Sequence, residues 1–131
     1  RLSVRSLDRD VRILLEKRIT ELVHAQAQSY GVSADIDYQR GYPVTVNAPE
    51  NTDYAVEVAR AVSGQVDPDT PPLMGAEDFS FMLNERPGAY IFLGNGDTAM
   101  VHHPAYNFDD NVIPFGASWY AGMVETRMPA A

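Results

Sequence analysis

The chain has 131 residues, a formal net charge of -8 and no cysteine. An acidic surface repels nucleic acid and anionic membranes, so neither is expected as a partner. Without cysteine the chain offers no disulfide, no thiolate nucleophile and no cysteine ligand for zinc, which fits a cytoplasmic protein. No apolar run approaches the roughly 20 residues that a membrane-spanning helix needs.

The first forty residues predict a strand, a long helix and a second strand. Apolar and polar residues alternate over residues 2–7 and 32–39, a pattern typical of half-buried strands. Between them, Asp8 is a suitable N-cap and Gly31 a suitable C-terminal glycine for a helix over residues 9–29. The apolar residues of this helix recur at helical spacing and form one stripe: Val11, Leu14, Leu15, Ile19, Leu22 and Val23.

Two strands are too few for an independent sheet, so this region is expected to be half of an α+β layer whose other strands lie upstream. The chain also opens on Arg1 and directly on a strand pattern, which favours a piece of a longer protein over a processed small one. A turn pattern over residues 40–43 predicts a boundary between a part of residues 1–41 and a part of residues 42–131.

The second part predicts strands and helices in alternation. Short strands are expected over residues 44–46 and 89–93, because both are short apolar runs between turn signals. Helices are expected from a cap at Asn51 or Thr52 to Val62 with Gly64 closing it, in a short segment that ends near Leu83, and over about 114–127. Four aromatic residues are expected in the core rather than in a ligand stack: Tyr90, Phe92, Trp119 and Tyr120.

Two adjacent histidines, His102 and His103, follow a glycine-rich loop at the end of a predicted strand. Ligands of α/β proteins gather outside strand ends, and neutral imidazole is the commonest metal ligand. A histidine pair in a loop is nevertheless more often structural, so the pair alone leaves both interpretations open. Because neighbouring side chains of an extended stretch point to opposite sides, we expect one ligand rather than two.

Other candidate groups are fewer than a catalytic metal needs. A catalytic zinc takes three protein ligands and an open position, and His24 is the only further histidine. Glu77 and Asp78 could do acid–base work or hold a cation, although helix capping is the favoured interpretation for Asp78. The backbone amides of residues 94–96 (Gly94, Asn95 and Gly96) could bind a carboxylate or simply form a turn.

Together these motifs resemble the C-terminal part of the M20 family of metal-dependent amidohydrolases and peptidases. Three segments carry the resemblance in order, namely residues 75–80 (GAEDFS), 87–96 (PGAYIFLGNG) and 102–110 (HHPAYNFDD). Residues 42–47 (YPVTVN) are similar to the segment by which the family re-enters its catalytic domain, and residues 2–30 to the end of its inserted lid. The most similar branch contains hippurate hydrolases, N-acyl-amino-acid amidohydrolases and auxin-conjugate hydrolases.

The resemblance implies a fold and an activity. Residues 42–131 would be the C-terminal portion of an α/β catalytic domain, and residues 1–41 half of a ferredoxin-like α+β lid that usually mediates dimerisation, so a homodimer is expected. The family hydrolyses the amide bond of N-acyl amino acids or peptides with a water held on two divalent metal ions, zinc or manganese, and a glutamate as general base.

Carried over by residue, the family's C-terminal metal ligand falls on His102, whereas His103 stands at a position that the family fills variably. Glu77, Asp78, His103 and residues 94–96 are expected to bind the substrate or to lie near the site. The general base and the other ligands, among them a cysteine in this branch, belong to N-terminal motifs that the chain lacks. The 131 residues alone are therefore expected to be inactive, and the alternative is a non-catalytic module that oligomerises through the open edge of an unfinished sheet.

Overall fold

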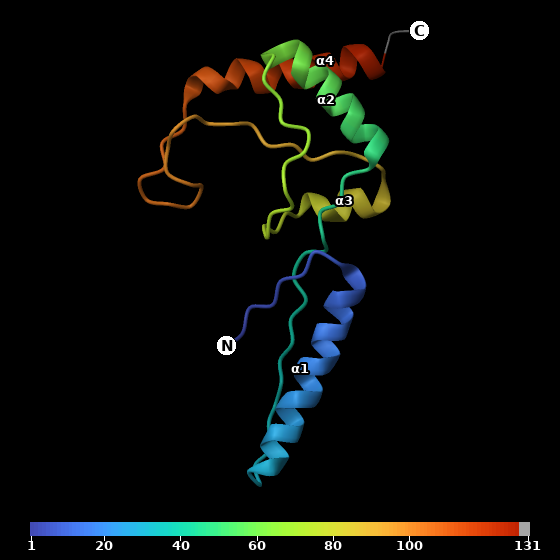
Figure 1. The fold of residues 1–131 in the computed structure, drawn as a ribbon, viewed down its shortest axis with the longest axis vertical. Coiled ribbons are helices and arrows are strands. Elements are labelled where there is room, and N and C mark those ends of the chain that lie inside the picture. The colour runs from blue at the N-terminus through green and yellow to red at the C-terminus, as the bar shows by residue number, and fades with distance from the viewer. Residues whose placement is uncertain (129–131) are drawn as a thin grey trace. The chain divides into compact units, whose positions relative to one another are not determined.

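The computed structural model describes residues 1–128 (Figure 1). The chain divides into two compact units, one of residues 1–46 and 71–86, the other of residues 47–70 and the chain from 87 onward. Within residues 1–128 five helical segments follow one another: α1 (Arg9–Ser29), α2 (Pro49–Ser63), α3 (Phe79–Glu85), the 3-10 helix η1 (Asp110–Val112) and α4 (Ile113–Arg127). Nowhere in residues 1–128 is a helix both long enough and apolar enough to cross a membrane.

Helix α1 begins and ends where the sequence predicts. The Asp8 carboxylate accepts a hydrogen bond from the backbone N–H of Val11 at 2.8 Å, which satisfies one of the free donors of the first turn. At the other end Gly31 has φ 67°. Its N–H donates to Gln28 and that of Val32 donates to Ala27, each at 3.0 Å, which is the Schellman arrangement. Local signals thus fix both ends of this helix.

The apolar stripe of α1 has little to cover it. No residue of α1 is buried, and Leu14 and Leu22 are 55% and 67% exposed. The segment after α1 runs back beside the helix (Figure 1), where Arg12 donates to the Gly41 carbonyl at 2.7 Å and Arg40 pairs with Glu16 at 2.6 Å. These polar contacts hold the segment alongside α1, but they do not bury the stripe.

The four predicted strands are wrong for the part of the chain that the structure describes. Residues 2–7, 32–39, 44–46 and 89–93 are neither helical nor paired in a β-ladder, so residues 1–128 contain no strand. A strand exists only through backbone hydrogen bonds to a neighbouring strand, and alternation of side chains cannot supply the neighbour. The expected α/β fold class is therefore present only in its helices, and the ferredoxin-like lid and the boundary at residue 41 stay predictions.

Helix α2 begins earlier than predicted. Its N-cap is Ala48 and its first residue is Pro49, whereas Asn51 or Thr52 was expected to cap it. Proline suits the first helical position because its φ is already helical and its missing N–H would have no partner there. The Ala48 N–H, just outside the helix, donates to the Gly88 carbonyl at 2.9 Å. Gly64 closes the helix with φ 69°, as predicted.

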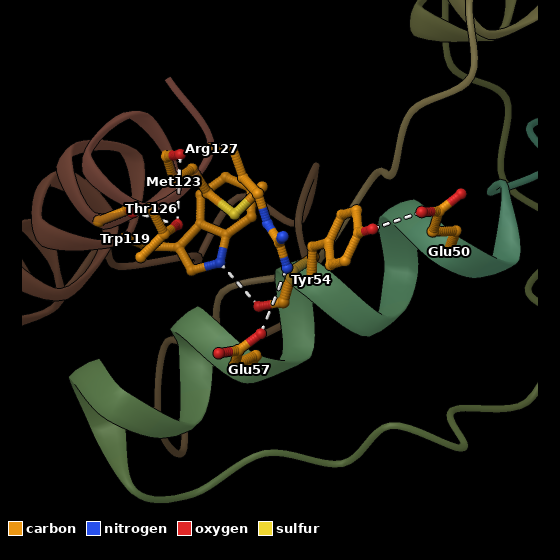
Figure 2. A network of polar contacts seen from close by, with 9 residues as sticks. Glu50, Tyr54, Glu57, Trp119, Met123, Thr126 and Arg127 are labelled. Carbon is orange, nitrogen blue, oxygen red and sulfur yellow. Dashed lines mark hydrogen bonds and ion pairs between the residues drawn. The ribbon is translucent and has the colours of Figure 1, made fainter. Parts of the chain in front are cut away.

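Helices α2 and α4 pack against each other. Ala55 and Val58 of α2 are the buried hydrophobic residues within residues 1–128, and a Cβ on Gly122 of α4 would lie 2.8 Å from Cγ1 of Val58. The glycine therefore permits the close approach of the two helices. Trp119 adds a polar contact, since its indole N–H donates to the Ala55 carbonyl at 3.0 Å (Figure 2).

A charged network joins the same two helices near the end of α4 (Figure 2). The Arg127 guanidinium carbon lies 3.1 Å from the centre of the Tyr54 ring, and the same group pairs with Glu57 at 3.3 Å. The Tyr54 hydroxyl donates to the Glu50 carboxylate, and this hydrogen bond raises the pKa of Tyr54. This network was not predicted from the sequence, although Glu50 and Tyr54 stand four residues apart, a spacing that places them on one helix face.

Of the four aromatic residues expected in the core, two are half-buried and two are exposed. Trp119 is half-buried against α2, and Tyr90 is half-buried near the start of α2. Phe92 and Tyr120 are 65% and 71% exposed, so their prediction as core residues is wrong for this structure. Helix α4 carries apolar residues on every side, and α2 can cover only one side of it.

Candidate functional site

The candidate metal ligand lies on a loop that closes on itself through side chains. We define the His102 loop as residues 96–108. At its base the Asn95 side chain donates to the Asn107 carbonyl and accepts from the Asp109 N–H, both at 2.8 Å. Just inside, the Asn107 N–H donates to the Thr98 hydroxyl at 3.2 Å. Three side chain–backbone hydrogen bonds therefore hold the two ends of the loop together.

Two consecutive turns present the histidine pair. The His103 N–H donates to the Met100 carbonyl at 3.1 Å, and the Tyr106 N–H donates to the His103 carbonyl at 2.9 Å. His102 is the third residue of the first turn and has φ 69°, whereas Val101 before it has a negative φ. These signs define a type II turn, whose third position favours glycine or asparagine.

His102 is thus held in an uncommon conformation. It is the one non-glycine residue with positive φ among residues 1–128. The left-handed region costs such a residue about 1 to 2 kcal/mol, and strained residues of this kind cluster at functional sites. The strain itself indicates a place to look for function.

The two imidazoles of the pair have different surroundings. Nδ1 of His103 accepts the Ala105 N–H at 3.0 Å, so the ring is held against its own turn. The His102 ring is exposed and makes no hydrogen bond within the described residues. Both its nitrogens therefore remain available, and His102 fits a metal ligand better than His103 does.

The carboxylates after the pair do not join His102. Asp109 caps η1 instead, since its side chain accepts from the backbone N–H of Asn111 at 3.0 Å and from the Asn111 side chain at 2.6 Å. Within the described chain no three histidine, aspartate or glutamate residues gather closely enough to hold a metal ion. That His102 supplies a single metal ligand stays a prediction.

Glu77 and Asp78 belong to the other compact unit. Asp78 stands at the N-cap position of α3, but its side chain makes no capping hydrogen bond. Its backbone is already helical, with φ -69° and ψ -21°, whereas a capping side chain needs an extended residue to reach back. Capping by Asp78 is therefore wrong. Glu77 is half-buried, and its carbonyl accepts from the backbone N–H of Ser80 at 3.2 Å.

The glycines of the loop base have open surroundings. A Cβ on Gly94 or Gly96 would meet nothing within 4 Å, so neither glycine is there for close packing. Gly96 has φ 73°, which glycine adopts without strain. Its carbonyl accepts from the Thr98 N–H at 3.1 Å, in line with the turn interpretation of this segment. Binding of a substrate carboxylate by its amides stays a prediction.

Comparison with known proteins gives the class to which this chain belongs. Residues 6–126 match the model of peptidase family M20/M25/M40. The match covers nearly the whole chain, so the chain belongs to this family. The motifs quoted from the sequence and the family assignment therefore agree.

Individual relatives are similar over a part of their length. Hippurate hydrolase of Campylobacter jejuni is 35% identical over 123 residues, which are 92% of this chain and 32% of the relative. Thermostable carboxypeptidase 2 of Saccharolobus solfataricus is 34% identical over 125 residues, 91% of this chain and 31% of the relative. N-acetyldiaminopimelate deacetylase of Streptococcus suis is 31% identical over 114 residues, 86% and 30% respectively. The chain thus spans about a third of these relatives' length, and no solved structure matches it.

Proposed function

We propose that the complete protein to which this chain belongs hydrolyses the amide bond of N-acyl amino acids, with His102 as one ligand of its divalent metal. Membership of the M20/M25/M40 family supports a hydrolase. Among the relatives, one is named a hippurate hydrolase and another a deacetylase of an N-acetylated diamino acid, and both names describe cleavage of an N-acyl amino acid.

The observation that carries the proposal is the state of the His102 imidazole. It is exposed, free of hydrogen bonds within residues 1–128 and held in a strained turn. A structural histidine would use its nitrogens within the fold, as His103 does with the Ala105 N–H. A metal ligand keeps a nitrogen available instead, and this difference favours His102 as the ligand.

Within the described residues no group of three histidine, aspartate or glutamate side chains could hold a metal ion, so we propose that the rest of the complete protein supplies most of the metal shell. Zinc or manganese is proposed, with two ions in each complete subunit. Such ions, when bound, polarise the amide carbonyl and lower the pKa of a water, which is the chemistry that amide hydrolysis needs. In this proposal His102 supplies one imidazole nitrogen as a metal ligand, and its turn holds the residue in place.

The test is His102→Ala in the complete protein. We expect the bound zinc or manganese to fall and hydrolysis of hippurate to drop by about 100-fold or more, because a lost ligand affects the site more than the tenfold to 100-fold of a lost supporting partner. His24→Ala is the matched control, since His24 is exposed on α1 and should change neither quantity. Unchanged metal content and turnover in the His102 variant would contradict the proposal.

A second candidate is a non-catalytic module that associates with another chain. The observation that favours it is the uncovered apolar surface, which includes the stripe of α1 and Tyr120 and Val124 on α4. Exposed apolar surface of this extent marks an interaction site in soluble proteins. Calorimetric titration of the 131-residue chain with zinc separates the candidates, because tight stoichiometric binding by this chain alone would contradict the module.

A further inference from the structure

The base of the His102 loop contains a side chain whose hydrogen bonds the proposed chemistry does not use. Asn95 is half-buried, and its carboxamide acts in two ways at once. Its nitrogen donates to the Asn107 carbonyl and its oxygen accepts from the Asp109 N–H, each at 2.8 Å. A carboxamide is suited to this double task, because it carries a donor and an acceptor side by side.

These two bonds lie across the chain, not along it. They join residue 95 to residues 107 and 109, so they close a loop whose interior holds two turns and the strained His102. The loop interior has its own hydrogen bonds, from Thr98 to Gly96 and across each turn. Those local bonds do not fix the position of the turns relative to the chain segments on both sides. The two Asn95 bonds do so, together with the bond from the Asn107 N–H to the Thr98 hydroxyl.

We propose that Asn95 is a positioning residue for the metal site: its carboxamide closes the His102 loop and thereby sets where the His102 imidazole stands. This inference rests on the proposed role of His102 as a metal ligand. Asn95 itself would touch neither metal nor substrate. It acts through the loop, as groups that orient a ligand do in other metal sites.

The chain offers an isosteric test. Asn95→Asp keeps the oxygen that accepts from the Asp109 N–H but replaces the donor to the Asn107 carbonyl with a second oxygen. In the complete protein we expect the affinity for zinc to fall by about tenfold to 100-fold, the range found when a supporting partner of a ligand is lost. Asn95→Ala, which removes both bonds, should lower the affinity further.

A matched control removes the effect of charge. Asn107 contributes its backbone to the loop base, and its side chain makes no hydrogen bond in the described structure. Asn107→Asp therefore adds the same negative charge to the loop base, on an exposed side chain, without breaking a bond, and its zinc affinity should stay within about twofold of the parent protein, as for a surface change. Equal losses in both aspartate variants would assign the effect to charge and overturn the inference.

A double-mutant cycle separates positioning from simple loop stability. If Asn95 acts through His102, Asn95→Asp weakens zinc binding in the parent protein but not in a His102→Ala background. The same factor in both backgrounds, or a lowered melting temperature with unchanged zinc affinity, would overturn the inference. Should His102→Ala leave zinc affinity unchanged, the proposed function fails first and takes this inference with it.

One further variant guards against misfolding. Thr98→Val removes the hydroxyl that accepts the Asn107 N–H at 3.2 Å and keeps the shape of the side chain. It weakens the same loop base by a single bond, so we expect a smaller loss of zinc affinity, about twofold to tenfold, again absent in the His102→Ala background. A well-folded Thr98→Val protein with full zinc affinity would count against positioning by the loop base.

Discussion

Helix α1 and the helices of the α2–α4 pair were all predicted from the sequence, yet they have opposite surroundings. No residue of α1 is buried. The α2–α4 pair buries Ala55 and Val58, shares a close approach at Gly122 and is joined through Trp119. A helical pattern therefore shows which face can be covered, and only the presence of a partner surface decides whether it is covered.

The difference predicts where a truncated side chain matters most. Trp119→Ala removes a half-buried indole and its bond to the Ala55 carbonyl, and we expect it to destabilise the α2–α4 unit by about 2 to 4 kcal/mol. Leu22→Ala in α1 removes a side chain that is 67% exposed, so its effect should stay below about 1 kcal/mol. Hydrogen exchange of the helix amides, measured helix by helix, distinguishes the two.

Tyr120→Ala serves as the control within α4. Tyr120 follows Trp119 directly but is 71% exposed, so removal of its ring should change exchange protection far less. If the two aromatic variants lost protection equally, the asymmetry of α4 described above would be wrong.

A single carbon atom added at Gly122 should disrupt the close approach of α2 and α4. Gly122→Ala would place a Cβ 2.8 Å from Cγ1 of Val58, and a valine side chain cannot move aside without repacking. Overpacking costs about 1 to 3 kcal/mol and the gain in helix propensity returns about 1, so we expect a net loss of about 1 kcal/mol. Urea unfolding followed by circular dichroism measures it.

Gly116→Ala is the matched substitution in the same helix. Its Cβ would lie 3.3 Å from Cδ2 of Leu93, the far end of a flexible side chain that can adjust. The gain in helix propensity should then prevail and make this variant neutral or more stable. A more stable Gly122→Ala protein would show that the helices do not approach each other as described.

The ends of α1 and α3 give a comparison of two aspartates. Asp8→Ala removes a capping bond and should destabilise α1 by about 1 kcal/mol. Asp78→Ala removes no capping bond, because that side chain makes none, and we expect less than about 0.5 kcal/mol. Thermal unfolding of both variants, followed by circular dichroism, tests the contrast. Equal losses of stability in the two variants would show that both aspartates cap their helices.

The smallest effect concerns pH. The hydrogen bond to Glu50 raises the pKa of Tyr54 above its usual value near 10, so the folded state holds the phenolic proton more tightly than the unfolded state. The corresponding stability is fully present below about pH 10 and is lost as the pH rises through the higher folded-state pKa. Tyr54→Phe should remove this part of the fall in stability at alkaline pH. The midpoints of urea unfolding, measured between about pH 8 and pH 11, test this.

The sequence pointed to the family and to candidate site residues, whereas the hydrogen-bonded base of the His102 loop could not be predicted from it. The order of motifs gave the family. That the adjacent histidines supply one metal ligand stays a prediction, and the structure adds that Nδ1 of His103 accepts the Ala105 N–H. The role of Asn95 was not predictable, because its partners lie 12 and 14 residues away and are backbone groups that carry no sequence signal. Capping by Asp78 failed because the backbone at that residue turned out to be helical.

By itself, the sequence determined the ends of α1, the closing glycine of α2 and the family. Each of these depends on neighbours within a few residues or on a motif that can be read directly. The tertiary structure alone decided that residues 2–7, 32–39, 44–46 and 89–93 form no strand within residues 1–128 and which apolar faces are covered. Both depend on a partner surface, since ladder hydrogen bonds and apolar burial exist only between segments and not within one.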